Sequence, residues 1–368
     1  MILRSLLLSC CLLVASCGAP DATAVGLAYL GQFRVSPGAT LDGTVIGGLS
    51  GISYDRPSNR YFVISDDRSA RNPARFYTVQ VSLSDNGIRD LEFTSTHPLL
   101  TRDGKPFGAL DTNIRPPVVP PDSEGIAVDS RRQRFYWSSE GERLTDAPGG
   151  PVLLDPWIRV AGLDGSYQGQ FSLPPVLKMS AAQRGPRQNH GLEGLALTPD
   201  GSALWAAMEG PGYDDGEPPT EAHGALTRIT RFDVDTGEPT AQYAYPVDKV
   251  SAGPGGDNGL TDLVALNDDD FLVLERGYGT HVAARVYRAE IGDADDVSAQ
   301  PSLNTAPVKP MTKTLLADLT TTPSLSPVDN IEGITLGPTL PDGRQSVVMV
   351  SDDNFSPRQI TQFLAFAI

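Results

Sequence analysis

The amino-acid sequence predicts an all-β protein, a β-propeller of five four-stranded blades, and three observations lead to this fold class. A short phrase that opens an apolar run occurs five times, at intervals of 74, 69, 69 and 70 residues, and begins at Ser50, Glu124, Glu193, Asp262 and Glu332. Short strand-like runs fill each interval and are separated by turns rich in glycine, proline, asparagine and aspartate. The last repeat is one strand short, and an apolar run precedes the first. A near-constant period of this length indicates a repeat architecture.

Each repeat contains four predicted strands, except the fifth, which contains three. In chain order the predicted strands are residues 51–54, 61–65, 76–83 and 88–95; 125–128, 135–138, 157–161 and 168–173; 194–197, 203–208, 227–234 and 241–245; 263–266, 271–274, 285–291 and 312–316; and 333–336, 346–350 and 361–368. The run 26–35 supplies the missing strand, because pairing beside the C-terminal strand closes the ring and removes an open sheet edge. We therefore expect a single domain over 26–368. Six blades are the alternative, if a long loop holds a degenerate blade.

The first residues differ from the rest of the chain. Residues 1–16 have a basic start and a short apolar stretch, which is typical of a secretory signal and too short for a stable membrane span. The ending at Cys17 resembles a bacterial lipoprotein box, so we expect lipidation of Cys17 and a short linker over 17–25. Gly18 after this cysteine is typical of an outer-membrane lipoprotein that faces the periplasm in a Gram-negative host. The alternative is an ordinary cleaved signal and a soluble periplasmic or secreted protein.

The overall charge limits the partners. The chain has 45 acidic and 29 basic residues and a formal net charge of −16. An acidic surface of this size repels nucleic acid and anionic membranes, so we expect no nucleic-acid partner and membrane contact only through the lipid anchor. The three cysteines all lie within the first 17 residues, which leaves no internal disulfide and no thiol nucleophile for the mature domain.

The repeated phrase predicts a ring of carboxylates. In a propeller the first strand of each blade lines the central channel and the second runs antiparallel beside it, so the start of one and the end of the other meet at one face. Acidic residues occupy both of these places. Carboxylate oxygens, in a domain that has no cysteine, are ligands that favour Ca²⁺. The predicted metal ligands are Asp66, Glu124, Glu193, Glu209, Asp262, Glu332 and Asp352. The alternative is a scaffold role, in which each acid caps a turn or pairs with an arginine of its own blade. The glycine that follows most of these acids is expected where backbones crowd at the axis.

Basic residues lie near the same face, in or beside long loops. We expect four of them to bind an anionic substrate, namely Arg68, His190, Arg276 and Arg358. The alternative is that these side chains are simply solvated. The sequence contains none of the common serine-hydrolase, zinc-protease or phosphate-loop motifs, so no catalytic residue is assigned.

Several stretches together resemble the phytase-like family, also described as "esterase-like activity of phytase". They are residues 49–54, 62–68, 122–127, 189–197 and 329–334, and the most specific is 350–359. The fourth repeat departs from the pattern, with Leu263 where glycine is usual. The resemblance covers roughly residues 26–368 and implies an exported propeller with phosphoesterase or esterase activity. If that activity holds, we expect metal-assisted hydrolysis, with Ca²⁺ on Glu124, Glu193, Glu332 and Asp352 and with arginines such as Arg68 and Arg276 neutralising charge.

The resulting hypothesis is a calcium-dependent phosphoesterase or esterase-like hydrolase that acts on a small anionic substrate at the acidic face. Two alternatives belong to other classes: a lactonase-like hydrolase, and a non-catalytic propeller that binds a ligand or protein at the cell envelope. Fold alone does not decide among them. The sequence leaves the substrate and the oligomeric state open.

Overall fold

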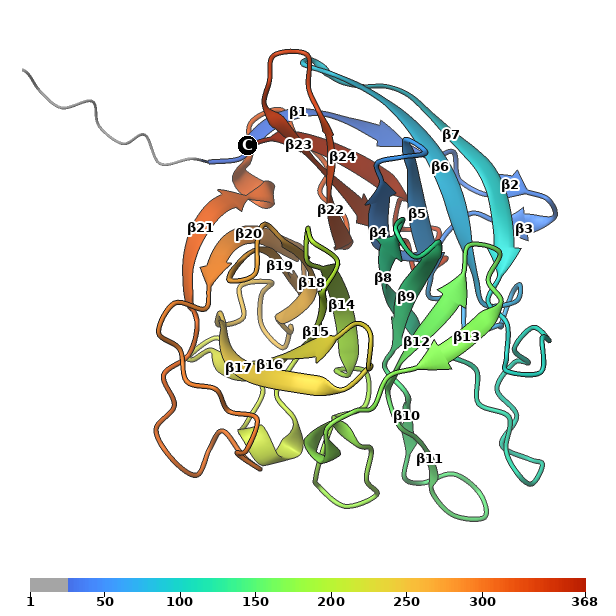
Figure 1. Ribbon diagram of the computed structural model, residues 1–368, viewed down its shortest axis with the longest axis vertical. Coiled ribbons are helices and arrows are strands. Elements are labelled where there is room, and N and C mark those ends of the chain that lie inside the picture. The colour runs from blue at the N-terminus through green and yellow to red at the C-terminus, as the bar shows by residue number, and fades with distance from the viewer. Residues whose placement is uncertain (1–25) are drawn as a thin grey trace, which may run out of the picture.

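The computed structural model describes residues 26–368, which form five four-stranded antiparallel sheets around a central axis (Figure 1). Blade 1 contains β4 (Leu49–Asp55), β5 (Arg60–Ser65), β6 (Arg75–Ser84) and β7 (Gly87–Pro98), and blade 2 contains β8 (Ser123–Asp129), β9 (Arg134–Ser139), β12 (Trp157–Gly162) and β13 (Tyr167–Gln170). Blade 3 contains β14 (Leu192–Leu197), β15 (Ala203–Met208), β16 (Ala225–Asp233) and β17 (Pro239–Val247). Blade 4 contains β18 (Gly259–Ala265), β19 (Asp270–Tyr278), β20 (Val282–Glu290) and β21 (Thr312–Asp318). Blade 5 contains β22 (Ile331–Thr339), β23 (Gln345–Ser351), β24 (Gln362–Ala367) and β1 (Ala28–Arg34).

The predicted fold class and ring closure are confirmed. Strand β1 pairs antiparallel with β24, from Ala28 opposite Ala367 to Arg34 opposite Gln362, so the N-terminal strand completes the last blade. The innermost strands β4, β8, β14, β18 and β22 contact one another around the ring. The described residues form five blades, which corrects the six-blade alternative. The predicted signal peptide, the linker and Cys17 lie outside the described residues.

Two small hairpins were not predicted, because each has only two or three residues per strand. They are β2 (Thr40–Leu41) with β3 (Thr44–Val45) and β10 (Glu142–Leu144) with β11 (Val152–Leu154). The helices of the described part are three single 3₁₀ turns, Pro175–Leu177, Tyr213–Asp215 and Leu319–Thr321. Over 26–368 there is no helix with the length and apolar character needed to cross a membrane.

The core lies between neighbouring blades rather than at one centre. Trp205 of blade 3, for example, packs edge-on against Phe271 of blade 4, with ring centroids 5.1 Å apart. Phe76 of blade 1 packs edge-on against Phe135 of blade 2, and Phe62 of blade 1 packs against the same ring in a tilted arrangement. Aromatic pairs of this kind contribute about 0.5–1.5 kcal/mol beyond the area they bury. This packing fixes the angle between blades and therefore the positions of the inner strands.

A β-bulge opens every inner strand at the repeated phrase. The register shifts between Leu49 and Gly51 in blade 1 and between Ile331 and Gly333 in blade 5, and blades 2 and 3 have the same irregularity at Glu124 and Glu193. In blade 4 the shift falls between Leu260 and Asp262, so Thr261 is the residue left unpaired. A bulge redirects a side chain out of the regular alternation. The repeat therefore presents Ser50, Glu124, Glu193, Thr261 and Glu332 at equivalent places.

The glycine after the bulge has the predicted steric reason. A Cβ atom on Gly51 would lie 2.3 Å from the carbonyl oxygen of Glu124, and one on Gly125 would lie 2.4 Å from that of Glu193. Asp262 takes this glycine position in blade 4. Its carboxylate accepts hydrogen bonds from the backbone N–H groups of Leu263 (2.9 Å) and Ile334 (2.8 Å), and so bridges to blade 5.

Candidate functional site

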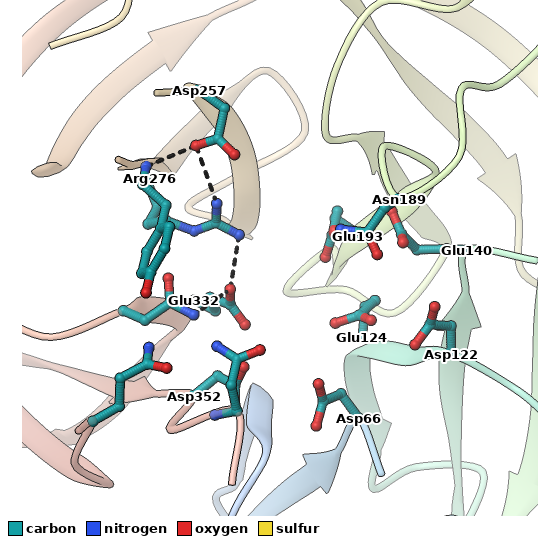
Figure 2. A pocket seen from close by; sticks show the side chains of 14 residues that line it. Asp66, Asp122, Glu124, Glu140, Asn189, Glu193, Asp257, Arg276, Glu332 and Asp352 are labelled. Carbon is teal, nitrogen blue, oxygen red and sulfur yellow. Dashed lines mark hydrogen bonds and ion pairs between the residues drawn. The ribbon is translucent and has the colours of Figure 1, made fainter. Parts of the chain in front are cut away.

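A cavity of about 400 Å³ opens at the axis, where the inner strands begin and the second strands end (Figure 2). Its carboxylates are Asp66, Asp122, Glu124, Glu140, Glu193, Asp257, Glu332 and Asp352. Of the described residues that line it, only Arg276 is basic, and Asn189, Tyr278, Asn330, Asn354 and Gln359 complete the wall. Eight carboxylates around one guanidinium make a strongly cation-attracting cavity.

The structure gathers most, but not all, of the predicted metal ligands. Five of the seven line the cavity, namely Asp66, Glu124, Glu193, Glu332 and Asp352. Glu209 lies beside it, with a carboxylate oxygen within 4.8 Å of one from Glu140 and one from Glu193. Asp262 does not line the cavity, because the bulge in blade 4 puts Thr261 at the ring position and turns Asp262 toward backbone donors.

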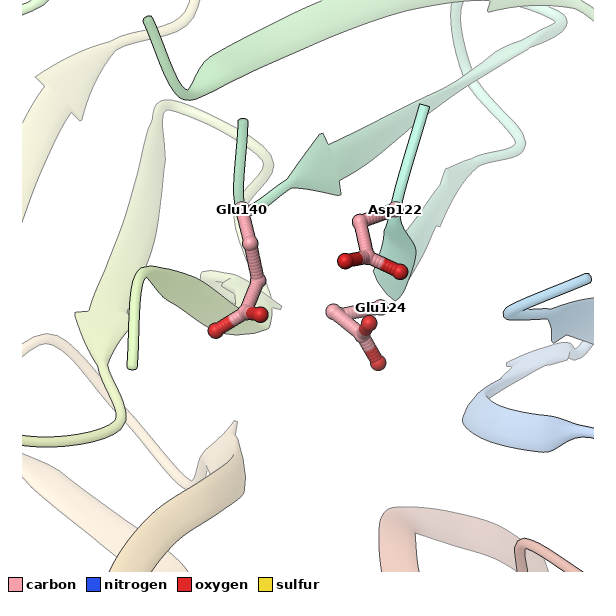
Figure 3. Close-up of side chains that lie close together, drawn as sticks. All are labelled: Asp122, Glu124 and Glu140. Carbon is pink, nitrogen blue, oxygen red and sulfur yellow. The ribbon is translucent and has the colours of Figure 1, made fainter. Parts of the chain in front are cut away.

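On one side of the cavity, few basic groups of the protein lie close enough to neutralise the acids. Asp122, Glu124 and Glu140 each offer a carboxylate oxygen, and these three atoms lie within 4.8 Å of one another (Figure 3). Glu140 accepts a hydrogen bond from the N–H of Gly191 (2.5 Å), and Asp122 lies 3.4 Å from Arg68. We call Asp122, Glu124, Glu140 and Glu193 the open acid half.

Burial and mutual repulsion raise the pKa values of the open acid half. Burial, opposed by Arg68, raises the pKa of Asp122 to about 6, and burial with the charges of Asp122 and Glu209 raises that of Glu140 to about 8. The same two causes raise the pKa values of Glu124 and Glu193 well above the usual range. A bound cation would favour the ionised form of this half, since like charges this close disfavour one another.

On the other side of the cavity, Arg276 in the wall and His190 just outside it neutralise the acids. The Arg276 guanidinium donates to Glu332 (2.8 Å) and lies 3.5 Å from Glu209 and 3.6 Å from Asp257. His190 Nδ1 lies 2.8 Å from Glu209 Oε2. We call Arg276, His190, Glu209, Glu332 and Asp257 the paired half.

Ion pairing decides the direction of the pKa shift for three residues of the paired half, and burial decides it for Glu332. Burial alone would lower the pKa of His190, but the Glu209 carboxylate raises it to about 9. Burial likewise opposes ionisation of Glu209, yet His190 and Arg276 hold its pKa below the usual range. The charges of Glu332, Glu209 and Asp257 overcome burial and raise the pKa of Arg276. For Glu332 burial prevails over Arg276, and its pKa is raised.

The open acid half and its surroundings fit Ca²⁺. Glu193 is 8% exposed and its carboxylate has no hydrogen bond or ion pair among residues 26–368. Two lining oxygens, Asp66 Oδ1 and Asn330 Oδ1, are buried without a hydrogen-bond partner in the described part of the chain. Buried polar atoms are normally partnered, so these two oxygens are available to a ligand or to water. Carboxylate and amide oxygens are the donors that Ca²⁺ prefers.

The predicted substrate-binding residues occupy different places. Arg276 lines the cavity, and His190 is held beside it by Glu209. Arg68 pairs with Asp122 and with the buried Glu142, and it is not a lining residue. Arg358 lines a separate cavity.

The candidate ligand set above missed three cavity acids. Glu140 follows the second strand of its blade as Asp66 does, and this strand-end position predicts it at the acidic face although it is not among the seven predicted ligands. Asp122 lies two residues before Glu124 and shares its approach to the axis. Asp257 comes from the loop before β18, and nothing in the neighbouring sequence indicates that it lines the acidic cavity.

Together these features define a five-bladed propeller with an acidic central cavity. The chain belongs to the phytase-like family, described as "esterase-like activity of phytase", whose model matches residues 44–355. No curated protein matched the sequence.

Three solved structures found by comparison of backbone coordinates have low sequence identity to this protein. Hydrazine synthase of Kuenenia stuttgartiensis is 13% identical, with 86% of this chain and 81% of that chain covered and a TM-score of 0.36. A GH43_12 protein from a capybara gut metagenome is 10% identical, with 93% and 57% covered and a TM-score of 0.42. A xylan β-1,4-xylosidase of Bacillus halodurans C-125 is 11% identical, with 84% and 50% covered and a TM-score of 0.45. The chain thus spans about half the length of the last two, and none of the three bears on its activity.

Proposed function

We propose that this protein is a calcium-dependent hydrolase of small phosphoesters, with its site in the acidic cavity. The observation that carries the proposal is the imbalance of the lining, eight carboxylates against one guanidinium. An anionic ester is repelled by such a cavity unless a cation first offsets the charge. Membership of the phytase-like family supports an ester-cleaving activity.

The residues suggest a division of labour. The open acid half would hold Ca²⁺, whose contribution is Lewis-acid polarisation of a phosphoryl oxygen. Arg276, oriented by Glu332 and Asp257, would bind a second oxygen of the same group through its guanidinium. His190 would hold a proton beside the cavity, fixed at Nδ1 by Glu209, and thereby add positive charge near the bound anion.

Phosphate release from a panel of small phosphoesters tests the proposal. We expect turnover with Ca²⁺, loss of turnover in EDTA and recovery when Ca²⁺ is restored. Glu124→Gln should lose activity, whereas Glu92→Gln, an exposed acid on β7, should keep it. Absence of phosphate release from every ester, with Ca²⁺ bound, would refute the assignment.

The neutral part of the wall favours a second candidate activity on the same cavity. Asn189, Asn354, Gln359 and Tyr278 offer hydrogen bonds without charge, which suits an uncharged cyclic ester as well as a phosphoester. Lactone ring opening belongs in the same panel. Calcium-dependent ring opening without phosphate release would reassign the site to a lactonase.

We also propose export and lipid anchoring, which rest on the sequence of residues 1–17. In a Gram-negative host the wild-type protein should fractionate with membranes. Cys17→Ser should move it to the soluble fraction or leave its precursor unprocessed. Identical fractionation and processing of both proteins would contradict the anchor.

A further inference from the structure

A second cavity, of about 360 Å³, lies beside the acidic one and differs from it in character. The segment 353–361 lines it on one side, and Gln359 lines both cavities. Its remaining wall comes from residues 35–38, from Val45 and Ile46, and from Arg71. The loop that follows β23 therefore separates an acidic cavity from this neighbouring one.

The second cavity combines an apolar wall with two guanidinium groups. Val35, Ile46 and Ile360 contribute aliphatic surface, and Phe355 contributes an aromatic ring. Arg71 lies over the Phe355 ring, 4.9 Å from its centroid, and Nη2 donates a long hydrogen bond of 3.4 Å to the Phe355 carbonyl oxygen.

Neither guanidinium has a carboxylate partner within residues 26–368. The side chain of Arg358 makes no hydrogen bond or ion pair in that part of the chain. Both groups therefore retain free donors at the cavity, although acids greatly outnumber bases in this protein.

The one carboxylate in the lining is already occupied by other donors. Asp353 Oδ1 accepts hydrogen bonds from the N–H groups of Gly48 (2.9 Å) and Phe355 (3.0 Å), and Oδ2 accepts one from Thr361 Oγ1 (2.9 Å). These contacts hold the loop and leave the arginines to set the charge offered to a ligand.

The wall is held in place before any ligand binds. Asn354 and Phe355 both adopt left-handed backbone conformations, with φ of 46° and 48°. Such residues persist only where the surroundings fix them. Two contacts hold Phe355 here: its N–H donates to Asp353 Oδ1, and its ring packs so closely on Gly48 that a Cβ atom there would lie 2.6 Å away. A pre-formed wall lowers the entropic cost of binding.

We propose that this cavity binds an organic anion, a carboxylate or phosphate attached to a compact apolar group. Arg71 and Arg358 would hold the anionic group, and Phe355, Val35 and Ile360 would contact the apolar one. The site requires no metal, so it is independent of the hydrolase proposed above.

Titration of EDTA-treated full-length protein with benzoate, followed by calorimetry or NMR, tests the site. Benzoate should bind saturably, and benzyl alcohol, which has the ring without the charge, should bind at least about tenfold more weakly. Arg71→Gln and Arg358→Gln should each weaken benzoate binding about tenfold. Phenyl phosphate in the same series compares phosphate with carboxylate.

Arg89→Gln is the matched control, because it removes the same charge from an exposed position on β7 and should leave benzoate affinity unchanged. Melting temperatures verify that all variants fold. Non-saturable binding, equal affinity for benzyl alcohol, or unchanged affinity in both arginine variants would overturn the proposal. Failure of phosphoester hydrolysis would leave it intact, since the measurement is made without metal and without turnover.

Discussion

The open acid half and the paired half both contain aspartate and glutamate, but only the paired half contains basic residues that neutralise them. In the open acid half, Glu124 and Glu193 have no protein cation against them, and burial raises their pKa values. In the paired half, Glu209 has both His190 and Arg276, and its pKa is lowered. Glu140 and Glu209, which follow the second strands of blades 2 and 3, therefore have pKa values shifted in opposite directions. The difference fits the proposal that one half binds an external cation, whereas internal ion pairs neutralise the other.

Removal of Arg276 should cause the largest loss of unfolding free energy, because this residue neutralises the paired half. Arg276→Gln leaves Glu332 and Glu209 without their guanidinium, and breaking a buried pair in this way costs about 3–5 kcal/mol. Denaturant unfolding in EDTA measures the loss. The control is Arg285→Gln, which breaks a partly exposed pair with Asp318 and should cost at most about 1 kcal/mol. Equal losses in the two variants would show that the paired half does not depend on Arg276.

In the open acid half, Glu124→Gln should raise the free energy of unfolding, whereas Arg276→Gln lowers it. Removing one of several crowded carboxylates relieves repulsion, so the metal-free protein should become more stable by about 1 kcal/mol. Calcium affinity should fall about 10- to 100-fold, because one charged ligand is lost. Calorimetric titration with Ca²⁺ and unfolding in EDTA measure the two effects.

Asp262→Asn is the comparison for Glu124→Gln, since Asp262 is equally an axial acid but accepts backbone N–H groups outside the cavity. It should reduce stability and leave calcium affinity unchanged. A loss of affinity in Asp262→Asn similar to that in Glu124→Gln would mean that the bulge does not separate the two acids.

The pH dependence of stability should distinguish metal-free from calcium-bound protein. The pKa values of Asp122 (about 6) and Glu140 (about 8) are raised in the folded state, so the folded protein binds more protons than the unfolded chain at intermediate pH. The free energy of unfolding should therefore fall as pH rises from about 4 to about 8, by up to about 1.4 kcal/mol per pH unit for each proton. His190 acts in the same direction, because its stabilisation is complete below 6.5 and is lost as pH rises through about 9.

If the open acid half binds Ca²⁺ as proposed, calcium should reverse much of this trend, since the ion would bind the ionised carboxylates. The gain in melting temperature on adding Ca²⁺ should increase between about pH 5 and about pH 8. Glu209 supplies an internal contrast, because its lowered pKa gives stability that is present above 4.5 and is lost as pH falls further. A calcium effect that does not change with pH would contradict the protonation of the open acid half.

The blade pattern was predictable because strand alternation and turn residues are local signals with a fixed period. The position of Asp262 was not, because a one-residue bulge is invisible when the phrases are aligned by their acids. Alignment by the preceding apolar residues, Leu49, Leu260 and Ile331, would have placed Thr261 in the ring. The difference between the open acid half and the paired half depends on the ion pairs that Arg276 forms with acids of blades 3 and 5. The spacing of residues in the sequence does not indicate which acids the Arg276 side chain contacts.

The smallest expected effect concerns Ser50, which holds the ring position of blade 1 without a charge. Its Oγ donates a hydrogen bond of 3.0 Å to Glu332 Oε2, so it belongs with the paired half although its equivalent in blade 2 is Glu124. Ser50→Ala should cost about 1 kcal/mol of unfolding free energy and leave calcium affinity unchanged, because no ligand of the open acid half is touched. Unfolding and calcium titration of the same sample measure both. A drop in calcium affinity as large as that of Glu124→Gln would instead place Glu332 among the calcium ligands and join the two halves into one site.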